Sequence, residues 1–134
     1  MNGKKYELLQ DQTIEWRGRT LYRICALRDL GSVHAGDVGG YIECEYNLSQ
    51  DGDAWVCGNA CVCGDARVSG NAWVSDNARV YGNAWVSGNA LVCGDARVYG
   101  NAWVSDNARV CDDARVSDNA WVSDNARVCG NADG

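Results

Sequence analysis

The stretch WVSDNAR, residues Trp103–Arg109, decides the fold, because most of the chain repeats it with small changes. From residue 51 to residue 134 the sequence divides into fourteen hexads, such as SDNARV, YGNAWV and CGDARV. Ala recurs every six residues from Ala54 to Ala132, and Val recurs every six residues from Val56 to Val128. A period this short and strict predicts a solenoid, in which each repeat packs against its neighbours.

The hexad separates an inner from an outer set of residues. Successive side chains of an extended segment point to opposite sides, so Ala and Val, two positions apart, share one side. The residue between them and the residue after Val face the other way. The next two positions hold Gly or Asp and then Asn or Asp, which tolerate positive φ and favour turns. Each hexad therefore predicts a short strand and a corner, with Ala and Val lining a narrow interior.

The outward residues indicate how many hexads form one coil. They match each other best at a spacing of 18 residues, better than at 12 or 6. Three hexads per coil predict a triangular prism with three flat faces. The first face carries Trp85, Trp103 and Trp121, with Arg67 and the column Ser69, Ser87, Ser105, Ser123; the second carries Arg79, Arg97, Arg115, Tyr81 and Tyr99; the third carries Trp55, Trp73, Leu91, Arg109 and Arg127 beside Cys57, Ser75, Cys93, Cys111 and Cys129.

The pattern V-S-D-N-A-W-V, an aliphatic residue followed four positions later by a small one, resembles the hexapeptide repeat of left-handed β-helix proteins. The resemblance implies an all-β fold, a left-handed parallel β-helix with 18 residues per coil. Left-handedness comes from this resemblance alone, since crossovers between parallel strands are usually right-handed. The segment GRTLYRICALRDLGSVHAGDVGGYIECEYNLS, residues 18–49, resembles the N-terminal part of bacterial and phage hexapeptide-array proteins, which are often labelled acyltransferases on the fold alone.

The N-terminal segment predicts a small cap. We expect residues 1–40 to form a β-rich cap with a hairpin that turns at Gly18, and residues 41–134 to form the solenoid. Tracing the hexads backwards places Ile42 and Leu48 in Ala slots and Cys44 in a Val slot. The cap is expected to cover the first coil edge, as terminal repeats of solenoids do.

The Trp column of the first face is the main candidate interaction surface, with Trp85, Trp103 and Trp121 beside Ser87, Ser105 and Ser123. In-register stacking that stiffens the rod explains it on structural grounds alone. An exposed strip of three Trp is also an apolar patch of the kind that binds proteins or stacks on sugars. Asn71, Asn89, Asn107 and Asn125 are expected to stack at one corner as an amide ladder.

The second face is a weaker candidate. Arg79, Arg97 and Arg115 place like charges about 4.8 Å apart, which is unfavourable unless offset. We expect corner carboxylates such as Asp76, Asp95 and Asp113 to neutralise the column, and Tyr81 and Tyr99 to stack on its guanidinium groups. A solvated face and an anion-binding face are the two interpretations.

The Cys residues are interpreted as reduced thiols that fill small outward slots. In-register neighbours have Cβ atoms about 4.8 Å apart, beyond the usual separation in a disulfide. Cys61 and Cys63 flank Val62 near Cys57 and form the one group considered for a soft metal. The chain has no C-x-x-C pair and no neighbouring His, so we expect no metal and no cofactor.

The chain is not expected to be an enzyme. The resemblance implies a general base supplied by a His between the coils of adjacent subunits, whereas the single imidazole here, His34, lies in the head. No Ser/His/Asp or Cys/His arrangement is recognisable, and an interior of Ala and Val leaves no pocket. We expect no catalytic residue, and acyl transfer is the third-ranked function.

The favoured hypothesis is a non-catalytic structural β-solenoid that self-associates through open coil edges or flat faces, including into filaments. Residues 117–134 are expected to form a terminal coil with an unpaired edge, a template for another copy. The alternative is a binding module that presents the Trp/Ser or Arg/Tyr face to a glycan or protein.

Charge and hydropathy bear on partners and compartment. A net charge of −6 disfavours nucleic acid, and no apolar run approaches the length of a membrane span. The N-terminal sequence lacks an apolar signal-peptide core, which predicts a cytoplasmic protein, with a phage-borne or exported form left open.

Overall fold

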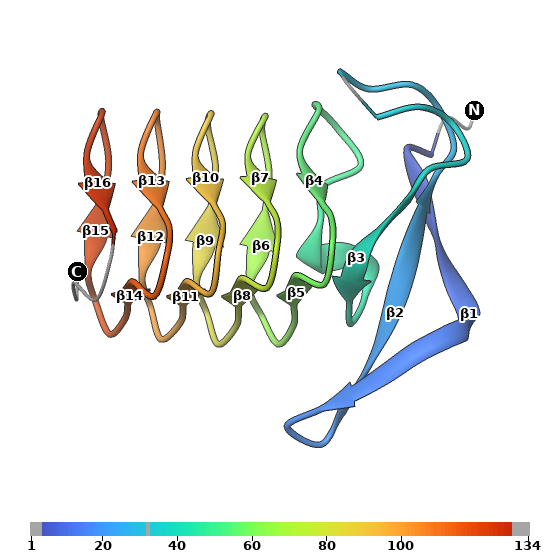
Figure 1. The fold of residues 1–134 in the computed structure, drawn as a ribbon, viewed down its shortest axis with the longest axis horizontal. Helices are drawn as coiled ribbons and strands as arrows, with labels where there is room; N and C mark the ends of the chain where they lie inside the picture. The colour runs from blue at the N-terminus through green and yellow to red at the C-terminus, as the bar shows by residue number, and fades with distance from the viewer. Residues whose placement is uncertain (1–3, 32, 130–134) are drawn as a thin grey trace.

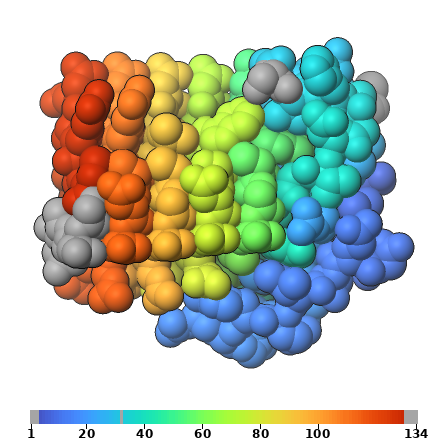
Figure 2. Space-filling model, viewed as in Figure 1, coloured from blue at the N-terminus to red at the C-terminus, as the bar shows by residue number. Residues whose placement is uncertain are grey.

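The computed structural model describes residues 4–31 and 33–129. Within them the chain is all-β apart from a single 3-10 turn, and parallel coils stack side by side along one axis. Figure 1 shows the coils in sequence order from β4 to β16, with the N-terminal strands closing one end. In Figure 2 the coils form consecutive coloured bands, and the N-terminal segment, in blue, packs beneath the first of them.

The head contains the longer strands, and the array contains only short ones. The head consists of β1 (Tyr6–Trp16), β2 (Arg19–Ala26), β3 (Val38–Ile42) and the 3-10 helix η1 (Glu45–Asn47). Every strand of the array is a two-residue pair ending in Val: β4 (Trp55–Val56), β5 (Cys61–Val62), β6 (Arg67–Val68), β7 (Trp73–Val74), β8 (Arg79–Val80), β9 (Trp85–Val86), β10 (Leu91–Val92), β11 (Arg97–Val98), β12 (Trp103–Val104), β13 (Arg109–Val110), β14 (Arg115–Val116), β15 (Trp121–Val122) and β16 (Arg127–Val128).

The strands form three sheets, one for each face of the prism. Their orders are β6-β9-β12-β15, β4-β7-β10-β13-β16 and, continuing the head, β1-β2-β3-β5-β8-β11-β14. Within the array each residue pairs in parallel with the residue 18 positions on, as Trp103 does with Trp121. The predicted coil of three hexads and the three predicted columns are therefore confirmed. The handedness of the coil stays a prediction.

The interior is a column of small aliphatic side chains. Every Ala and Val of the two inner slots from Ala54 to Val116 is at most 1 % exposed. Val104 lies in the stack between Val86 and Val122, its partners in the coils before and after. Because Ala is small and Val is β-branched, the three sheets approach closely and the extended backbone is favoured. The predicted inward assignment of Ala and Val is confirmed.

The corners adopt the predicted positive φ. Asp76 and Asp106 have φ of 60° and 57°, and Gly82 at an equivalent position has φ of 71°. The next corner position holds the amides: Asn71 donates to Asn89, and Asn89 to Asn107, at 3.3 Å each. These links of the predicted amide ladder are confirmed.

The head is a hairpin that continues one face of the prism. β1 and β2 are antiparallel and turn at Arg17 and Gly18, which both have positive φ, so the predicted turn is confirmed. β2 pairs antiparallel with β3, and β3 pairs in parallel with β5 of the array. One sheet therefore joins cap and solenoid, and the division at residue 40 stays a prediction.

The first coil departs from the hexad register by two residues. Ile42 pairs with Val62 and Leu48 with Val68, a separation of 20 residues rather than 18. The prediction that Ile42 and Leu48 occupy Ala slots is wrong, since both align with Val. Cys44, predicted in a Val slot, is exposed. The two additional residues lie after η1, because Leu48 and Val56 are eight residues apart while their partners Val68 and Val74 are six apart.

Two buried polar side chains satisfy carbonyls at the head end of the solenoid. Lys5 is fully buried, and its Nζ donates to the carbonyls of Ala54 (2.7 Å) and Gly52 (3.5 Å). Asn47 Nδ2 donates to the carbonyls of Gly64 (3.1 Å) and Ala66 (2.8 Å). Burial, followed by the positive charge of Arg28, lowers the pKa of Lys5 to about 8. The head therefore covers this coil edge and also supplies hydrogen-bond donors to its backbone carbonyls.

Candidate interaction surfaces

The Trp column lies on the sheet β6-β9-β12-β15 and is exposed along its length. The rings of Trp85 and Trp103 meet edge to face, with centroids 5.6 Å apart and an interplanar angle of 79°. Trp103 and Trp121 are stacked, at 5.1 Å and 6°. Trp85 and Trp103 are each 38 % exposed, and Trp121 is 66 % exposed. Trp stacking therefore contributes to coil-to-coil packing and still leaves an apolar strip facing outward.

A shallow groove lies on this face beside the edge-to-face pair Trp85 and Trp103. The groove has a volume of about 210 Å³ and is lined by Trp85, Trp103, Ala102 and the amides Asn83 and Asn101. The predicted Ser neighbours Ser87, Ser105 and Ser123 are half-buried in the adjoining column. The groove combines aromatic walls with hydrogen-bonding amides at its rim.

The hairpin covers the first members of the Arg/Tyr face. Trp16 meets Tyr81 edge to face at 5.0 Å, and the Arg79 guanidinium lies 5.2 Å from the Trp16 ring centroid. Tyr81 and Tyr99 stack on each other at 5.0 Å and 4°. The cation over Tyr81 is Arg17 of the hairpin, at 5.2 Å, rather than an Arg of the column as expected. This part of the face anchors the hairpin.

The corner carboxylates of Asp76 and Asp95 make hydrogen bonds between coils, and their expected neutralisation of the Arg column stays a prediction. Asp76 Oδ2 accepts from the backbone N–H of Gly94 at 3.1 Å, and Asp95 Oδ1 accepts from the Asn77 amide at 3.3 Å. Both bonds join neighbouring coils across 18 residues. These Asp residues therefore bridge the coils through hydrogen bonds.

A larger polar cavity, which the sequence did not indicate, lies between the hairpin and the prism. Its volume is about 610 Å³, and its lining includes Arg17, Arg19, Glu43, Asp65 and Tyr81. Arg19 Nη1 pairs with Glu43 Oε1 at 2.9 Å, and the same carboxylate oxygen accepts from the Gly64 N–H at 2.8 Å. The ion pair joins the turn end of the hairpin to the first coil.

Several outward residues of the early coils are buried because the head lies over them. Trp55, predicted to face solvent, is 1 % exposed and packs edge to face on Tyr6 at 6.4 Å. Cys61 and Cys63 pack against Leu21 beneath the hairpin. Cys57 is on a different sheet, where its sulphur accepts from Trp73 Nε1 at 3.1 Å. Of the three thiols considered together for a soft metal, Cys57 is therefore separated from Cys61 and Cys63.

Burial of Cys63 predicts a loss of stability at alkaline pH. Burial, followed by the negative charge of Glu43, raises its pKa from 9.0 to about 11. Because the folded pKa lies above the unfolded one, its contribution is complete below pH 9 and is lost as pH rises to about 11. We expect the melting temperature to fall across this interval.

Comparing the parent protein with Cys63→Ala isolates the contribution of Cys63. The comparison is needed because Lys5, whose pKa is lowered from 10.5 to about 8, makes stability rise with pH over that interval. Thermal melts followed by circular dichroism should show a shallower alkaline decline in the variant. Parallel curves for the two proteins from pH 9 to 11 would contradict the assignment.

His34 lies on an exposed turn of the head. Its Nδ1 is 3.9 Å from Asp29 Oδ1, and both side chains are 73 % exposed. Its backbone N–H donates to Asp37 Oδ2 at 2.9 Å. These contacts link His34 to two Asp residues of the turn between β2 and β3.

The stacked coils identify the class of protein. The YdcK beta solenoid repeat family matches residues 60–76, 74–88, 90–106 and 108–124, all within the array. The chain is a β-solenoid repeat protein. As such it is a structural or binding repeat module, and its resemblance to hexapeptide-array proteins stays a prediction. No curated protein matches the chain. Among the described residues, no helix has the length and apolarity that a membrane span requires.

Proposed function

We propose that this β-solenoid is a non-catalytic structural module that self-associates through the coil edge opposite the head. The observation that carries the proposal is the edge at which the described part of the three sheets ends. Within the described residues β14, β15 and β16 are the outermost strands of their sheets. Trp121 on β15 stacks on Trp103 through one ring face and is the most exposed Trp of its column.

The unpaired backbone of this edge is suited to strand addition. Trp103 and Ser105 donate their N–H groups to Ala120 and Val122 of the next coil, at 3.0 and 2.9 Å. Trp121 and Ser123 occupy the same slots one coil on, and no acceptor for their N–H groups lies among the described residues. Each such group gains about 1 kcal/mol net when paired, so several together favour a second strand.

A second copy of the chain is the partner that fits. The last described strands leave the same kind of backbone edge on every copy, so two copies can present identical edges to each other. Trp121 stacks on Trp103 through one face of its ring, and its other face can stack on a ring of a second copy at a similar distance of about 5 Å. Two such edges related by a two-fold axis pair antiparallel and bury the same surface on both copies.

The head supports a closed dimer over a filament. Growth into a filament requires the head end to accept an incoming coil. That end is occupied by β3 and by the hydrogen bonds of Lys5 and Asn47 to coil carbonyls. Association through the opposite edge therefore ends at two copies.

The non-catalytic part of the proposal is supported by the place of the single His. His34 lies on the head turn rather than between coils, and it contacts Asp29 and Asp37 of that turn. Incubation with acetyl-coenzyme A and a panel of amine and hydroxyl acceptors is expected to give no turnover. Acyl transfer that is lost in His34→Ala would contradict this.

Sedimentation velocity over a concentration series tests the association. We expect the 14.5 kDa chain to reach a plateau at twice its monomer mass. Trp121→Gln should shift the equilibrium to monomer, because it removes the ring that stacks across the edge. Trp103→Gln is the matched control on the same face, one coil inward, and should still dimerise.

The two variants separate the edge from the face. Equal loss of dimer in both would move the contact to the flat Trp face and contradict the edge proposal. A parent chain that sediments as a monomer at every concentration would contradict self-association itself. A mass that grows without a plateau would show that the head end also accepts a copy.

The groove on the Trp face favours a second candidate, glycan binding. Its walls are Trp85 and Trp103, and its rim carries Asn83 and Asn101, the residue types that stack on and hydrogen-bond to sugars. A soluble oligosaccharide panel is expected to quench Trp fluorescence in the parent and less in Trp85→Gln. Identical responses of the two proteins would exclude the groove.

A further inference from the structure

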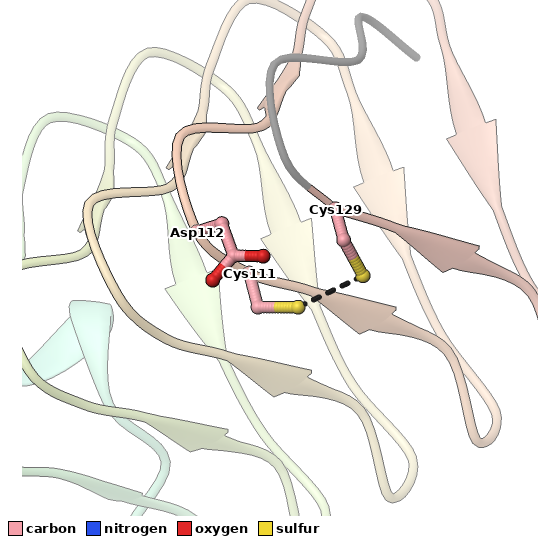
Figure 3. Close-up of side chains that lie close together, drawn as sticks. All are labelled: Cys111, Asp112 and Cys129. Carbon is pink, nitrogen blue, oxygen red and sulfur yellow. Dashed lines mark hydrogen bonds between the residues drawn. The ribbon is translucent and has the colours of Figure 1, made fainter.

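The Cys column of the sheet β4-β7-β10-β13-β16 brings two thiols into direct contact. Cys111 follows β13, Cys129 follows β16, and their sulphur atoms are 2.9 Å apart. The Asp112 carboxylate lies beside them, with one oxygen and both sulphurs all within 4.8 Å of one another. Figure 3 shows the two sulphurs pointing toward each other from neighbouring coils, with Asp112 next to Cys111.

We propose that Cys111, Cys129 and Asp112 form a binding site for a soft divalent cation such as Zn²⁺. Two thiolates and a carboxylate are three of the ligands that four-coordinate zinc accepts, and they leave one position for water or a further thiolate. The site lies on the surface of one chain, so it does not depend on the dimer proposed above.

The parallel coils give the sulphurs the separation that the metal requires. Two sulphurs bonded to tetrahedral zinc at about 2.3 Å are about 3.8 Å apart. Side chains on in-register strands that point the same way are about 4.8 Å apart, whereas here the sulphurs tilt together to 2.9 Å. The required spacing lies between these values and is reached by side-chain rotation without movement of either coil.

A disulfide and a metal place different demands on the two Cys. A disulfide needs Cβ atoms about 3.5–4.5 Å apart, whereas in-register parallel strands are spaced about 4.8 Å. A bridging metal ion spans the wider strand spacing. Cys93, one coil before Cys111 in the same column, supplies a further thiol close enough to interact with Cys111.

Positive charges beside the site favour the thiolate forms of the two Cys. Arg109 and Arg127 precede Cys111 and Cys129 by two residues, on the same side of their strands. Metal binding releases the thiol protons, so the affinity should fall as the pH is lowered.

Titration of the full 134-residue chain with Cd²⁺ tests the site. The protein is kept reduced with a phosphine, which lacks competing thiols, and thiolate-to-metal charge transfer is followed in the ultraviolet. We expect one equivalent of Cd²⁺ to saturate the high-affinity signal. Cys111→Ser and Cys129→Ser should each weaken binding by about tenfold or more, and Asp112→Asn by less. Cys44→Ser is the control, because Cys44 is exposed and belongs to the head.

A second measurement separates binding from folding. Cd²⁺ should raise the melting temperature of the parent and of Cys44→Ser, and leave that of Cys111→Ser unchanged. The proposal is overturned if Cys111→Ser, folded by circular dichroism, binds Cd²⁺ as tightly as the parent. It is also overturned if Cys44→Ser loses as much affinity for Cd²⁺ as Cys111→Ser and Cys129→Ser do.

Discussion

Replacing Val104 by Asp is expected to leave no cooperatively folded solenoid at 25 °C. Val104 is fully buried and lies in the interior stack between Val86 and Val122. The interior slots around it hold only Ala and Val, so a carboxylate there has no hydrogen-bond partner. Such a group costs several kcal/mol, against a total stability of about 5–15 kcal/mol for a domain of this size.

Arg97→Gln is the matched outward control. Arg97 pairs with Arg79 and Arg115 in the neighbouring coils, so its loss relieves like-charge repulsion and should change stability by less than about 0.5 kcal/mol. Circular dichroism and urea unfolding check both variants. Equal melting of the two proteins would mean that the inward and outward assignments are wrong.

Asn47→Ala is expected to have the second largest effect, a loss of about 3 kcal/mol or more. Asn47 is fully buried in η1 and makes four hydrogen bonds with backbone groups. Its Oδ1 accepts from the N–H groups of Glu43 and Cys44, and its Nδ2 donates to Gly64 and Ala66. The substitution leaves these groups unsatisfied at the junction of head and first coil, at about 1–3 kcal/mol each where no water replaces the amide.

Asn89→Ala provides the comparison for the same change of residue. Asn89 sits in the exposed amide ladder, where it accepts from Asn71 and donates to Asn107. Water can replace both bonds, so the loss should be about 1 kcal/mol or less. Urea denaturation of the two variants measures the difference. If Asn89→Ala cost as much as Asn47→Ala, the ladder rather than the head junction would hold the coils in place.

The array could be predicted from the sequence because its structure is set locally and repeated. The Ala and Val period fixes the interior, Gly and Asp fix the corners, and the match at 18 residues fixes the coil. The interior, the corners and the coil length each depend only on contacts within one coil and with the adjacent coils. The outward columns follow directly, which is why Trp85, Trp103 and Trp121 could be placed on one face beforehand.

The head could not be predicted in the same way, because its structure depends on contacts distant in sequence. Nothing near Trp55 indicates that Tyr6 will cover it, and nothing near Cys61 and Cys63 indicates Leu21 above them. The two-residue offset between Leu48 and Val56 was missed because Ile42 and Leu48 fit the hexad spacing equally well in the wrong slot.

The thiol cluster was missed for a related reason. Sequence spacing gives the separation of stacked Cβ atoms, but side-chain rotation decides how near Cys111 and Cys129 bring their sulphurs. A Cys column with an Asp immediately after one member is the signal that could have indicated it.

The uniform interior also bears on how such a chain changes length. Every coil of the array meets its neighbours through the same Ala and Val columns and the same 18-residue pairing. Inserting or removing one whole coil therefore preserves each interior contact and each outward column, whereas a change that is not a multiple of six residues turns the corners away from one another. The gene can lengthen or shorten this rod in steps of one coil, about 4.8 Å each, while the capped end stays the same.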